Sequence, residues 1–410
     1  MSPRPPWHRW MWRTFVLAVT VFAMSWQLRL AAADWFFQQD TIDSVHHALQ
    51  WTPEKVEYLD RLGELDSAHS AEILDRELNV APRLSRLWIE RATRAEFSGD
   101  STAAERLLLH AAEIDRTWLP RWVLTNFYFR QHADANFWIW ARRSLEFSHS
   151  DLTGLFELCS QMTGDAAIIQ RQLAITTPES TRAYVNYLRD RNHVRDAGSA
   201  ARTLIRIGSA ANDRPLLLSL VDQLIDTGEG RGAAELWNDL AAARWISQDR
   251  IAPEHPVSNP ALAAPFLGRG FDWRVVTDSG ITVIAGAAGF GPTVKFSGLQ
   301  ADGSVVLGQA FPAEPGLSYR LAYQASSETA ANTAGLYWRV TSRPWSNDDS
   351  ISIPVSADGQ QHDPTFVAPL DSTLAWLRLI YVRPKGAIPL AGEIRLHRVA
   401  VDRVATAPRQ

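Results

Sequence analysis

A helical hairpin that recurs about every 33 residues limits the folds open to this chain. Between Leu87 and Trp122 the sequence reads as two antiparallel helices joined by a turn at Gly99-Asp100. Small and aromatic residues recur in both helices at a period of 3.6, which is helical and not the period of two of a strand. They are Trp88, Ala92 and Ala95 in the first helix, and Ala104, Leu108 and Ala111 in the second.

Related openings occur along residues 34–248. The residues that open them are Tyr58, Trp88, Trp122, Leu155, Tyr184 and Leu217, at separations of 30, 34, 33, 29 and 33 residues. A hairpin of this size cannot bury its apolar face alone, so it must stack on further copies. The spacing therefore predicts an α-solenoid, and it also makes these aromatic residues candidates for the core between helices.

These residues resemble the tetratricopeptide-repeat (TPR) family. Ala48, Leu49 and Pro53 fit its pattern, as do Trp88, Ala92, Ala104, Leu108 and Ala111. The match weakens in the second half of the repeats. The resemblance implies a scaffold that binds a protein partner in a groove and implies no chemistry of its own.

Aromatic residues are dense between Trp118 and Phe147. Trp138 and Trp140 are two positions apart, so a helix points them about 200° apart and one core face cannot hold both. Both are partner-binding candidates, because an exposed aromatic side chain often dominates an interface. Cover by another part of the chain or by a membrane is the alternative.

The N-terminus predicts export. Arg4, Arg9 and Arg13 precede an apolar run, Thr14–Trp26, and Ala31-Ala32-Ala33 follow it. This order suits a cleavable signal peptide. Trp12 and Trp35, however, are 23 residues apart, or about 34 Å of helix, near the thickness of a bilayer. We favour an uncleaved single-pass anchor in the inner membrane, with the N-terminus in the cytoplasm and the bulk of the chain in the periplasm.

The pattern of residues changes after a proline-rich segment, residues 249–265. Nine short β-rich runs separated by turn residues indicate an antiparallel β-sandwich. They are Phe271–Val276, Ile281–Ala285, Thr293–Ser297, Ser304–Leu307, Tyr319–Gln324, Gly335–Thr341, Ser350–Val355, Leu374–Val382 and Glu393–Val401. The fold class is thus a multidomain α + β chain. Its expected parts are a tip and transmembrane anchor (1–33), a helical repeat domain (34–248), the linker (249–265), the sandwich (266–404) and a tail (405–410).

The stretches Tyr319–Tyr323, Ala375–Leu379 and Gly392–Leu396 resemble the jelly-roll, galactose-binding-like sandwiches of carbohydrate-binding modules. The segment Phe266–Arg274 also resembles exported repeat-plus-sandwich proteins of bacterial exopolysaccharide systems. The resemblance implies glycan binding by sugar rings that stack on aromatic side chains. The candidates are Trp345, Trp273, Trp338, Tyr381 and Arg383, and core packing is the alternative for those within strands.

Composition and motifs restrict the function further. The net charge of −4 argues against a nucleic-acid binder, and the single cysteine, Cys159, excludes a disulfide framework or a cysteine-rich zinc site. No catalytic motif is found, and no metal or cofactor is predicted. We therefore expect a non-enzymatic scaffold in envelope polysaccharide assembly or export. The alternatives are a glycan-modifying enzyme with its site where solenoid and sandwich meet, and a sandwich that only caps the solenoid.

Overall fold

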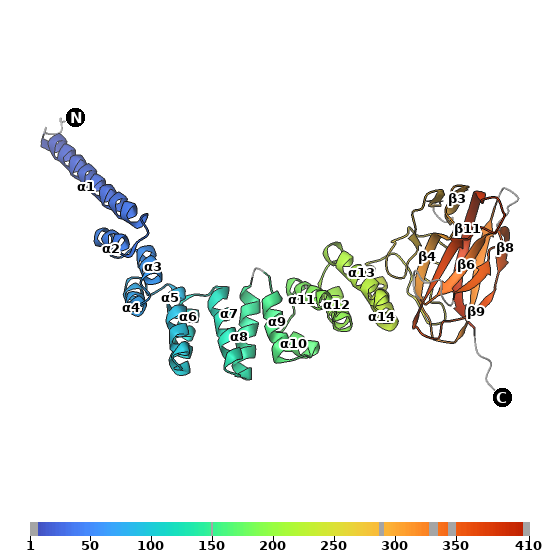
Figure 1. Cartoon of the computed structure of the whole chain (residues 1–410), viewed down its shortest axis with the longest axis horizontal. Coiled ribbons are helices and arrows are strands. Elements are labelled where there is room, and N and C mark those ends of the chain that lie inside the picture. The colour runs from blue at the N-terminus through green and yellow to red at the C-terminus, as the bar shows by residue number, and fades with distance from the viewer. Residues whose placement is uncertain (1–6, 149–150, 287–290, 328–334, 343–349, 405–410) are drawn as a thin grey trace, which may run out of the picture. The chain divides into compact units, whose positions relative to one another are not determined.

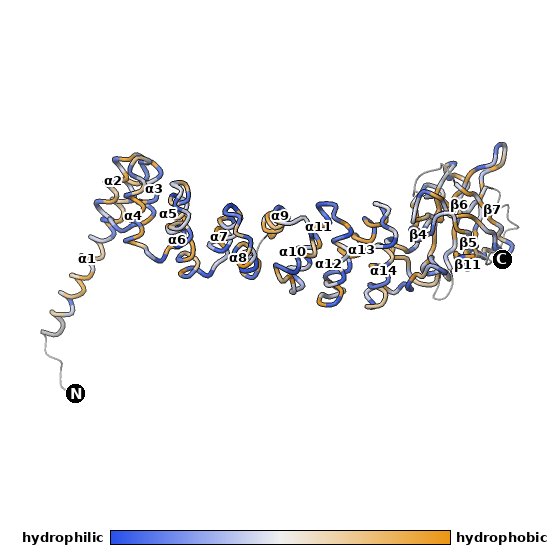
Figure 2. The backbone as a smooth tube through the Cα atoms, turned by 90° about the horizontal axis from the view of Figure 1, so that it is seen from below, coloured by the Kyte–Doolittle hydropathy of each residue, from blue (hydrophilic) through white to orange (hydrophobic). Residues whose placement is uncertain are grey.

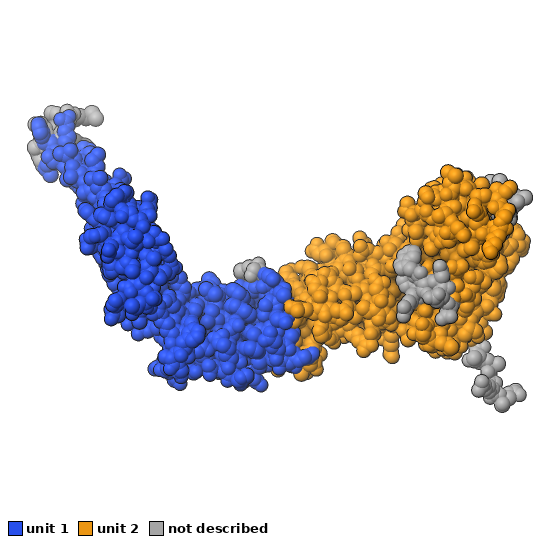
Figure 3. Space-filling model, in the orientation of Figure 1, with its two compact units in different colours: residues 1–164 blue, residues 165–410 orange. Residues whose placement is uncertain are grey.

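The computed structural model describes residues 7–148, 151–286, 291–327, 335–342 and 350–404, with side chains from Trp10 onward. Along the chain, helices come first and strands follow (Figure 1). The chain forms two compact units, residues 1–164 and residues 165–410, which Figure 3 colours separately. Each is described by itself.

Unit 1 is helical. Its elements are α1 (Trp7–Phe37), α2 (Ile42–Trp51), α3 (Val56–Leu65), α4 (Ser70–Val80), α5 (Ser85–Phe97), α6 (Ser101–Ile114), α7 (Trp118–Arg130), α8 (Asp134–Phe147) and α9 (Thr153–Met162). Consecutive helices pack as pairs, α3 with α4, α5 with α6 and α7 with α8. The helical hairpins predicted from the spacing are therefore present, while membership of the TPR family stays a prediction.

The hairpin of α5 and α6 shows how the sequence produces these pairs. Gly99 adopts a φ of +86°, a conformation that suits a residue without Cβ, and so reverses the chain. The side chain of Asp100 then caps α6 by accepting a hydrogen bond of 2.9 Å from the Ala103 amide. Ala92, Leu108 and Ala111 are fully or almost fully buried, as their helical spacing predicts.

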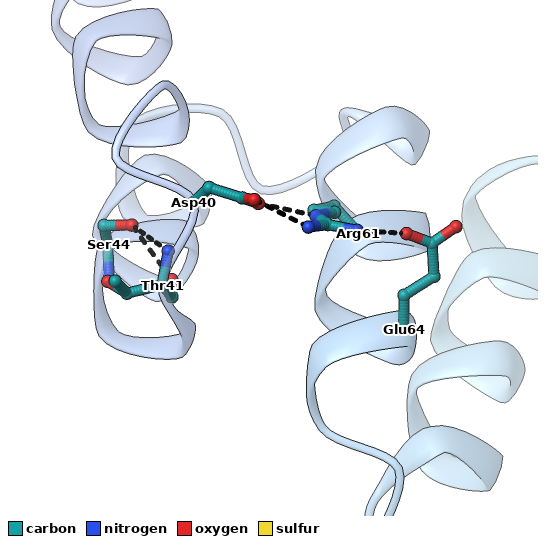
Figure 4. Close-up of polar contacts among 5 residues, drawn as sticks. All are labelled: Asp40, Thr41, Ser44, Arg61 and Glu64. Atoms are coloured by element: carbon teal, nitrogen blue, oxygen red, sulfur yellow. Dashed lines mark hydrogen bonds and ion pairs between the residues drawn. The ribbon is translucent and has the colours of Figure 1, made fainter.

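The first repeat helix, α2, is separate from α1. Helix α1 ends at Phe37, and Asp40, at a φ of +54°, turns the chain. Thr41 and Ser44 then exchange hydrogen bonds of 3.0 and 3.2 Å in a capping box that starts α2 (Figure 4). The capping hydrogen bonds of Thr41 and Ser44 thus start a new helix at this point.

Arg61 of α3 connects the turn at Asp40 to that helix. Arg61 donates two hydrogen bonds of 2.6 Å to the carboxylate of Asp40, and a third of 2.6 Å to Glu64 (Figure 4). The guanidinium group holds the pKa of Asp40 below its usual value. The path of the chain out of α1 is therefore fixed by a two-pronged ion pair.

Helix α1 has the features of a membrane span. The stretch Trp10–Phe37 is long and apolar enough to cross a bilayer, and none of its most apolar window is buried in the protein. Figure 2 colours most of it white to orange. A signal sequence has the same length and composition, so these features alone leave both sequence-based interpretations open.

Unit 2 begins with five helices. They are α10 (Ala166–Gln172), α11 (Pro178–Asp190), α12 (Val194–Ile207), α13 (Ala210–Asp226) and α14 (Gly230–Ala242). The side chain of Asp165 caps α10, and α11 packs on α12 as α13 packs on α14. The single cysteine, Cys159 of α9 in unit 1, is fully buried, and burial raises the pKa of its thiol.

The strands of unit 2 form two antiparallel sheets. They are β1 (Arg274–Val275), β2 (Ile281–Ile284), β3 (Thr293–Ser297), β4 (Ser304–Pro312), β5 (Ser318–Ser326), β6 (Leu336–Thr341), β7 (Ile351–Pro354), β8 (Asp358–His362), β9 (Thr365–Val367), β10 (Leu374–Tyr381) and β11 (Ala391–Arg403). Sheet A has the order β1-β4-β10-β6-β7, and sheet B the order β2-β3-β11-β5-β8 with β9 also on β5. Side chains from both sheets share one apolar core, so the predicted sandwich is confirmed, while the jelly-roll assignment stays a prediction.

The proline-rich segment is packed and does not act as a free tether. Val257 and Leu262 belong to the sandwich core, and Ile251 is also buried. Asn238 of α14 exchanges two hydrogen bonds of 2.8 Å with the backbone of Ile251. The last helices and the sandwich are therefore joined through an ordered segment, as their place in one compact unit requires.

Candidate functional site

Two neighbouring pockets lie where the end of α13 meets the outer face of sheet A. The first, here called the arginine pocket, has a volume of about 350 Å³, and its lining includes Asp226, Arg274, Val276, Gly308, Trp376 and Arg378. The second, the serine pocket, has a volume of about 420 Å³, and its lining includes Asp226, Thr227, Ser342, Asp371, Ser372 and Trp376. Asp226 and Trp376 belong to both, so the indole forms a wall between them.

Alternation along β10 explains how Trp376 and Arg378 reach this face. Ala375, Leu377 and Leu379 point into the core between the sheets. Side chains of a strand point alternately to opposite faces, so Trp376 and Arg378 lie on the outer face together. Both are nevertheless largely buried, with 6% and 4% of their surface exposed, because they form the walls of a recess.

Helix α13 contributes the other side of the site through an ion pair. Arg274 of β1 donates a hydrogen bond of 2.8 Å from Nη2 to Oδ1 of Asp222. The same carboxylate oxygen accepts a bond of 2.7 Å from the Gly270 amide. The guanidinium carbon of Arg274 lies 4.9 Å from the centre of the Trp376 ring, within the range of a cation–π contact. Asp222 thus holds Arg274 against the indole.

Asp226 lies at the rim, one helical turn beyond Asp222. Partial burial raises the pKa of its carboxyl, Arg274 lowers it, and the charge of Asp222 raises it again. The rim therefore carries a hydrogen-bond acceptor, and the side chains of Arg274 and Arg378 contribute to the wall. Such a mixture of one aromatic ring and several polar groups suits a small hydroxylated ligand.

Three of the predicted glycan-binding residues lie in the core, which corrects that expectation. Trp273 and Trp338 are fully buried, and their rings lie 6.3 Å apart between the two sheets. Tyr381 is 1% exposed, and its hydroxyl accepts a hydrogen bond of 3.1 Å from the Leu390 amide. These rings leave no face on which a sugar could stack. Trp338 and Tyr381 occupy inward-pointing positions of β6 and β10, and Trp273 directly precedes β1; the sequence did not distinguish such positions from outward-pointing ones.

The other two predicted glycan-binding residues, Trp345 and Arg383, are not in the core of the described structure. Trp345 lies outside the described residues, as does the polar stretch Asn347-Asp348-Asp349. Arg383 is exposed on the loop after β10 and does not line either pocket. Its amide donates a hydrogen bond of 2.8 Å to Asp302.

The two partner-binding candidates of unit 1 differ in exposure. Trp140 is 9% exposed and lies 4.5 Å from the guanidinium carbon of Arg143. Trp138 is half-buried, with its ring edge-on to Phe137. Trp140 therefore belongs to the helix packing, and Trp138 offers the larger surface to a partner.

Sequence reasoning missed Trp376 as a site residue and also missed a serine–histidine pair. Ser326 Oγ and His397 Nε2 are 2.7 Å apart between β5 and β11, where His397 sits at a bulge. Neither residue lines the arginine pocket or the serine pocket. The sequence of β10 carried no clear signal for the site on sheet A, because its inward- and outward-pointing residues are all buried.

No known protein family and no curated protein matches the chain. Solved structures similar to part of it include one described as "CBM4 structure and function", at 16% identity and a TM-score of 0.27, over 36% of this chain and 98% of that one. A carbohydrate-binding module of Cellvibrio mixtus lichenase 5A in complex with cellotriose is 12% identical at a TM-score of 0.21, over 32% and 92% of the two chains. TmCBM61 in complex with beta-1,4-galactotriose is 15% identical at a TM-score of 0.21, over 32% and 88%. These three similar structures are carbohydrate-binding modules.

Proposed function

We propose that this protein is a membrane-anchored, non-enzymatic scaffold of the cell envelope that binds a glycan through its sandwich. Its helical repeats would hold a protein partner, with Trp138 the more exposed of the two aromatic candidates. The proposed setting is polysaccharide assembly or export outside the cytoplasm. Glycan binding and anchoring rest on separate observations.

The observation that carries glycan binding is the pair of pockets divided by Trp376. Their volumes, about 350 and 420 Å³, fall in the usual range for small-molecule sites. A sugar ring combines an apolar face of C–H groups with a rim of hydroxyls. The part of Trp376 that lines the pockets can contact the first, and Asp226 and Ser372 can bond the second.

The anchor is supported by the way α1 ends. Ala33 is fully buried in a cluster with Val45, Ala48 and Tyr58. The Phe37 ring stacks on Tyr58 at a centroid distance of 4.5 Å, and Lys55 bonds Asp34 at 3.0 Å. The end of α1 therefore contributes Ala33 and Phe37 to the packing of the first hairpin, a role that a removed signal peptide would not have for Ala33.

We expect the full chain to stay attached to the membrane with its N-terminus in the cytoplasm. A reporter that is active only outside the cytoplasm, fused after Gln410, should be active. The intact mass of the extracted protein, measured by mass spectrometry, should correspond to a chain that still contains the residues before Ala33. A soluble, exported protein that begins at Asp34 would instead identify a signal peptide, and a wholly cytosolic protein would contradict export itself.

We expect the Trp376→Ala variant to lose most of its glycan binding, because the indole is a wall of both pockets. The full chain in detergent is titrated with envelope oligosaccharides by calorimetry, and thermal unfolding of the variant shows whether it is folded. Trp345→Ala is the comparison, since it tests the aromatic residue that the sequence favoured. Loss of binding with Trp345→Ala alone would assign glycan binding to Trp345 and not to Trp376.

The same titration separates the alternatives. Asp226 and Asp371 both line the serine pocket, and paired carboxyls are what a glycan-modifying enzyme would need. A scaffold should release no new reducing ends from the oligosaccharides, whereas an enzyme should. A chain that binds no envelope glycan would leave the sandwich with the role of a structural cap.

A further inference from the structure

Helix α1 divides at Arg29 into an exposed part and a packed part. Every residue from Trp10 to Leu28 is exposed, whereas Arg29 is half-buried and Ala33, one turn further on the same face, belongs to the core of the first hairpin. The exposed part has 19 residues and is about 28 Å long, close to the hydrocarbon thickness of a bilayer. The part of α1 that matches a membrane therefore ends near residue 28, before Trp35.

Helix α2 runs back along the packed part of α1. At the end of α2, the backbone oxygen of Trp51 accepts a hydrogen bond from Nε of Arg29. In the middle of α2, the His47 ring lies 5.3 Å from the ring of Phe36 near the end of α1. The two helices therefore lie side by side between the levels of Arg29 and Phe36, and a membrane layer around this part of α1 would also have to accommodate α2.

The surroundings of this packed part are too polar for hydrocarbon. Asp34 of α1 forms an ion pair of 3.0 Å with Lys55, and 55% of the Asp34 side chain is exposed. The exposed side chains of α2 include Asp43, His46 and Gln50. Charged and polar side chains are costly in the hydrocarbon core, so α2 and the part of α1 beside it belong outside that core.

Arg29 lies between two tryptophans, as suits the edge of a bilayer. Its guanidinium carbon lies 5.8 Å from the centre of the Trp26 ring, and its Nε bonds the backbone of Trp51. The two indole side chains are exposed, at 51% and 43% of the residue surface. Tryptophan favours the interface between membrane and water, and an arginine near the end of a span places its charge among the headgroups. These three residues therefore mark one level, where the exposed part of α1 and the helix α2 both end.

We infer that the membrane surface from which the chain emerges lies at Arg29, so that the end of α2 contacts the lipid headgroups and the helical repeats begin directly at the membrane. This inference rests on the proposed anchoring through α1. Trp26 lies at the hydrocarbon side of the headgroup layer, and Trp51 lies within that layer. Trp35 is six residues beyond Arg29, or about 9 Å further along α1, and so passes a headgroup layer that is about 5–8 Å thick.

Spin labels on single introduced cysteines test these depths in the full chain, reconstituted in vesicles of phosphatidylethanolamine and phosphatidylglycerol. The variants are Ser25→Cys, Trp35→Cys, Asp43→Cys and Gln50→Cys, all at exposed positions where a label should not disturb the fold. Each label is exposed to oxygen, which concentrates in hydrocarbon, and to a nickel chelate, which stays in water. Cys159 is fully buried, so the unsubstituted chain serves as the labelling blank.

The ratio of collisions with oxygen to collisions with nickel should fall from residue 25 to residue 35. The Ser25→Cys label should collide mainly with oxygen, and the Trp35→Cys label mainly with the nickel chelate. Asp43 and Gln50 are a matched pair, because residues seven positions apart lie on the same face of a helix, here about 10 Å apart along its axis. The ratio should be higher at Gln50→Cys than at Asp43→Cys, since only the first lies at the headgroups.

The outcomes separate this inference from the anchoring on which it rests. An oxygen-rich environment at residue 35 would place the membrane surface beyond Arg29, which would overturn the inference and leave the anchor in place. A ratio at residue 50 that is no higher than at residue 43 would also overturn the inference, because the end of α2 would not reach the headgroups. Contact of residue 25 with the nickel chelate, or a soluble chain without residues 1–33, would overturn the anchor and the inference together.

Discussion

Replacing Trp237 by alanine should lower the free energy of unfolding of unit 2 by about 3–5 kcal/mol, the usual cost of truncating a buried aromatic residue. Trp237 of α14 is fully buried, and its ring lies edge-on to Phe271 at 6.1 Å. Its indole N–H donates a hydrogen bond of 3.2 Å to the backbone oxygen of Asp249. The side chain thus joins the last helix, the proline-rich segment and the start of the sandwich.

The glycine beside this ring shows how closely the junction is packed. Gly270 has a φ of +57°, and a Cβ atom there would lie 2.5 Å from the Trp237 ring. The truncation would leave a cavity that the surrounding backbone, held by the bond from Gly270 to Asp222, cannot readily fill. The stability loss should therefore lie at the upper part of the range.

Urea unfolding of the full chain, followed through hydrogen exchange of peptides from unit 2, measures this effect. Trp245→Ala is the control, because Trp245 is eight positions further on and only half-buried, so its loss should cost about 1 kcal/mol or less. Equal losses for the two variants would mean that Trp237 does not join the helices to the sandwich.

The sequence was sufficient to predict the strands wherever apolar residues recur. Each of the nine expected strand regions overlaps an observed strand, although β4 extends five residues beyond its expected end. Strands β8 and β9 were missed, because Asp358–His362 is polar throughout and Thr365–Val367 is only three residues long. These two strands pair with β5 and owe their conformation to that neighbour, a tertiary effect that local sequence does not carry.

The candidate site could not be assembled from the sequence for a different reason. Every residue of β10 is buried, so its apolar pattern does not reveal which face is the core. Trp338 and Trp376 look alike in sequence, yet the first points inward and the second lines the pockets. Asp226 and Arg378 are far apart along the chain, and only the packing of α13 on sheet A brings them into one lining.

Glu77→Gln should make unit 1 more stable than the wild type at alkaline pH, and the gain should decrease as the pH is lowered toward 4. Glu77 of α4 is 3% exposed, and no hydrogen-bond partner of its Oε1 is found among the described residues. Burial is the largest cause that raises its pKa to about 8, followed by a hydrogen bond and repulsion from Asp60, while Arg86 acts in the opposite direction.

The direction of this pH dependence follows from which state of the protein, folded or unfolded, keeps the proton on Glu77. A glutamate in the unfolded chain titrates near pH 4.3, so between that pH and about 8 the folded protein keeps a proton that the unfolded chain has released. The contribution of Glu77 to stability is therefore complete below about pH 4.3, decreases as pH rises, and is lost above about pH 8. Glutamine stays neutral at every pH and avoids this loss.

We expect the stability difference between variant and wild type to increase by about 3–4 kcal/mol from pH 5 to pH 9, at roughly 1.4 kcal/mol for each unit of pKa shift. Hydrogen exchange of peptides from α3 to α5 in the full chain, corrected for the intrinsic pH dependence of exchange, measures it. Glu72→Gln, an exposed position of the same helix, is the control and should show no comparable alkaline gain. Parallel stability curves for wild type and Glu77→Gln between pH 5 and 9 would mean that Glu77 is already ionised in the folded protein at neutral pH.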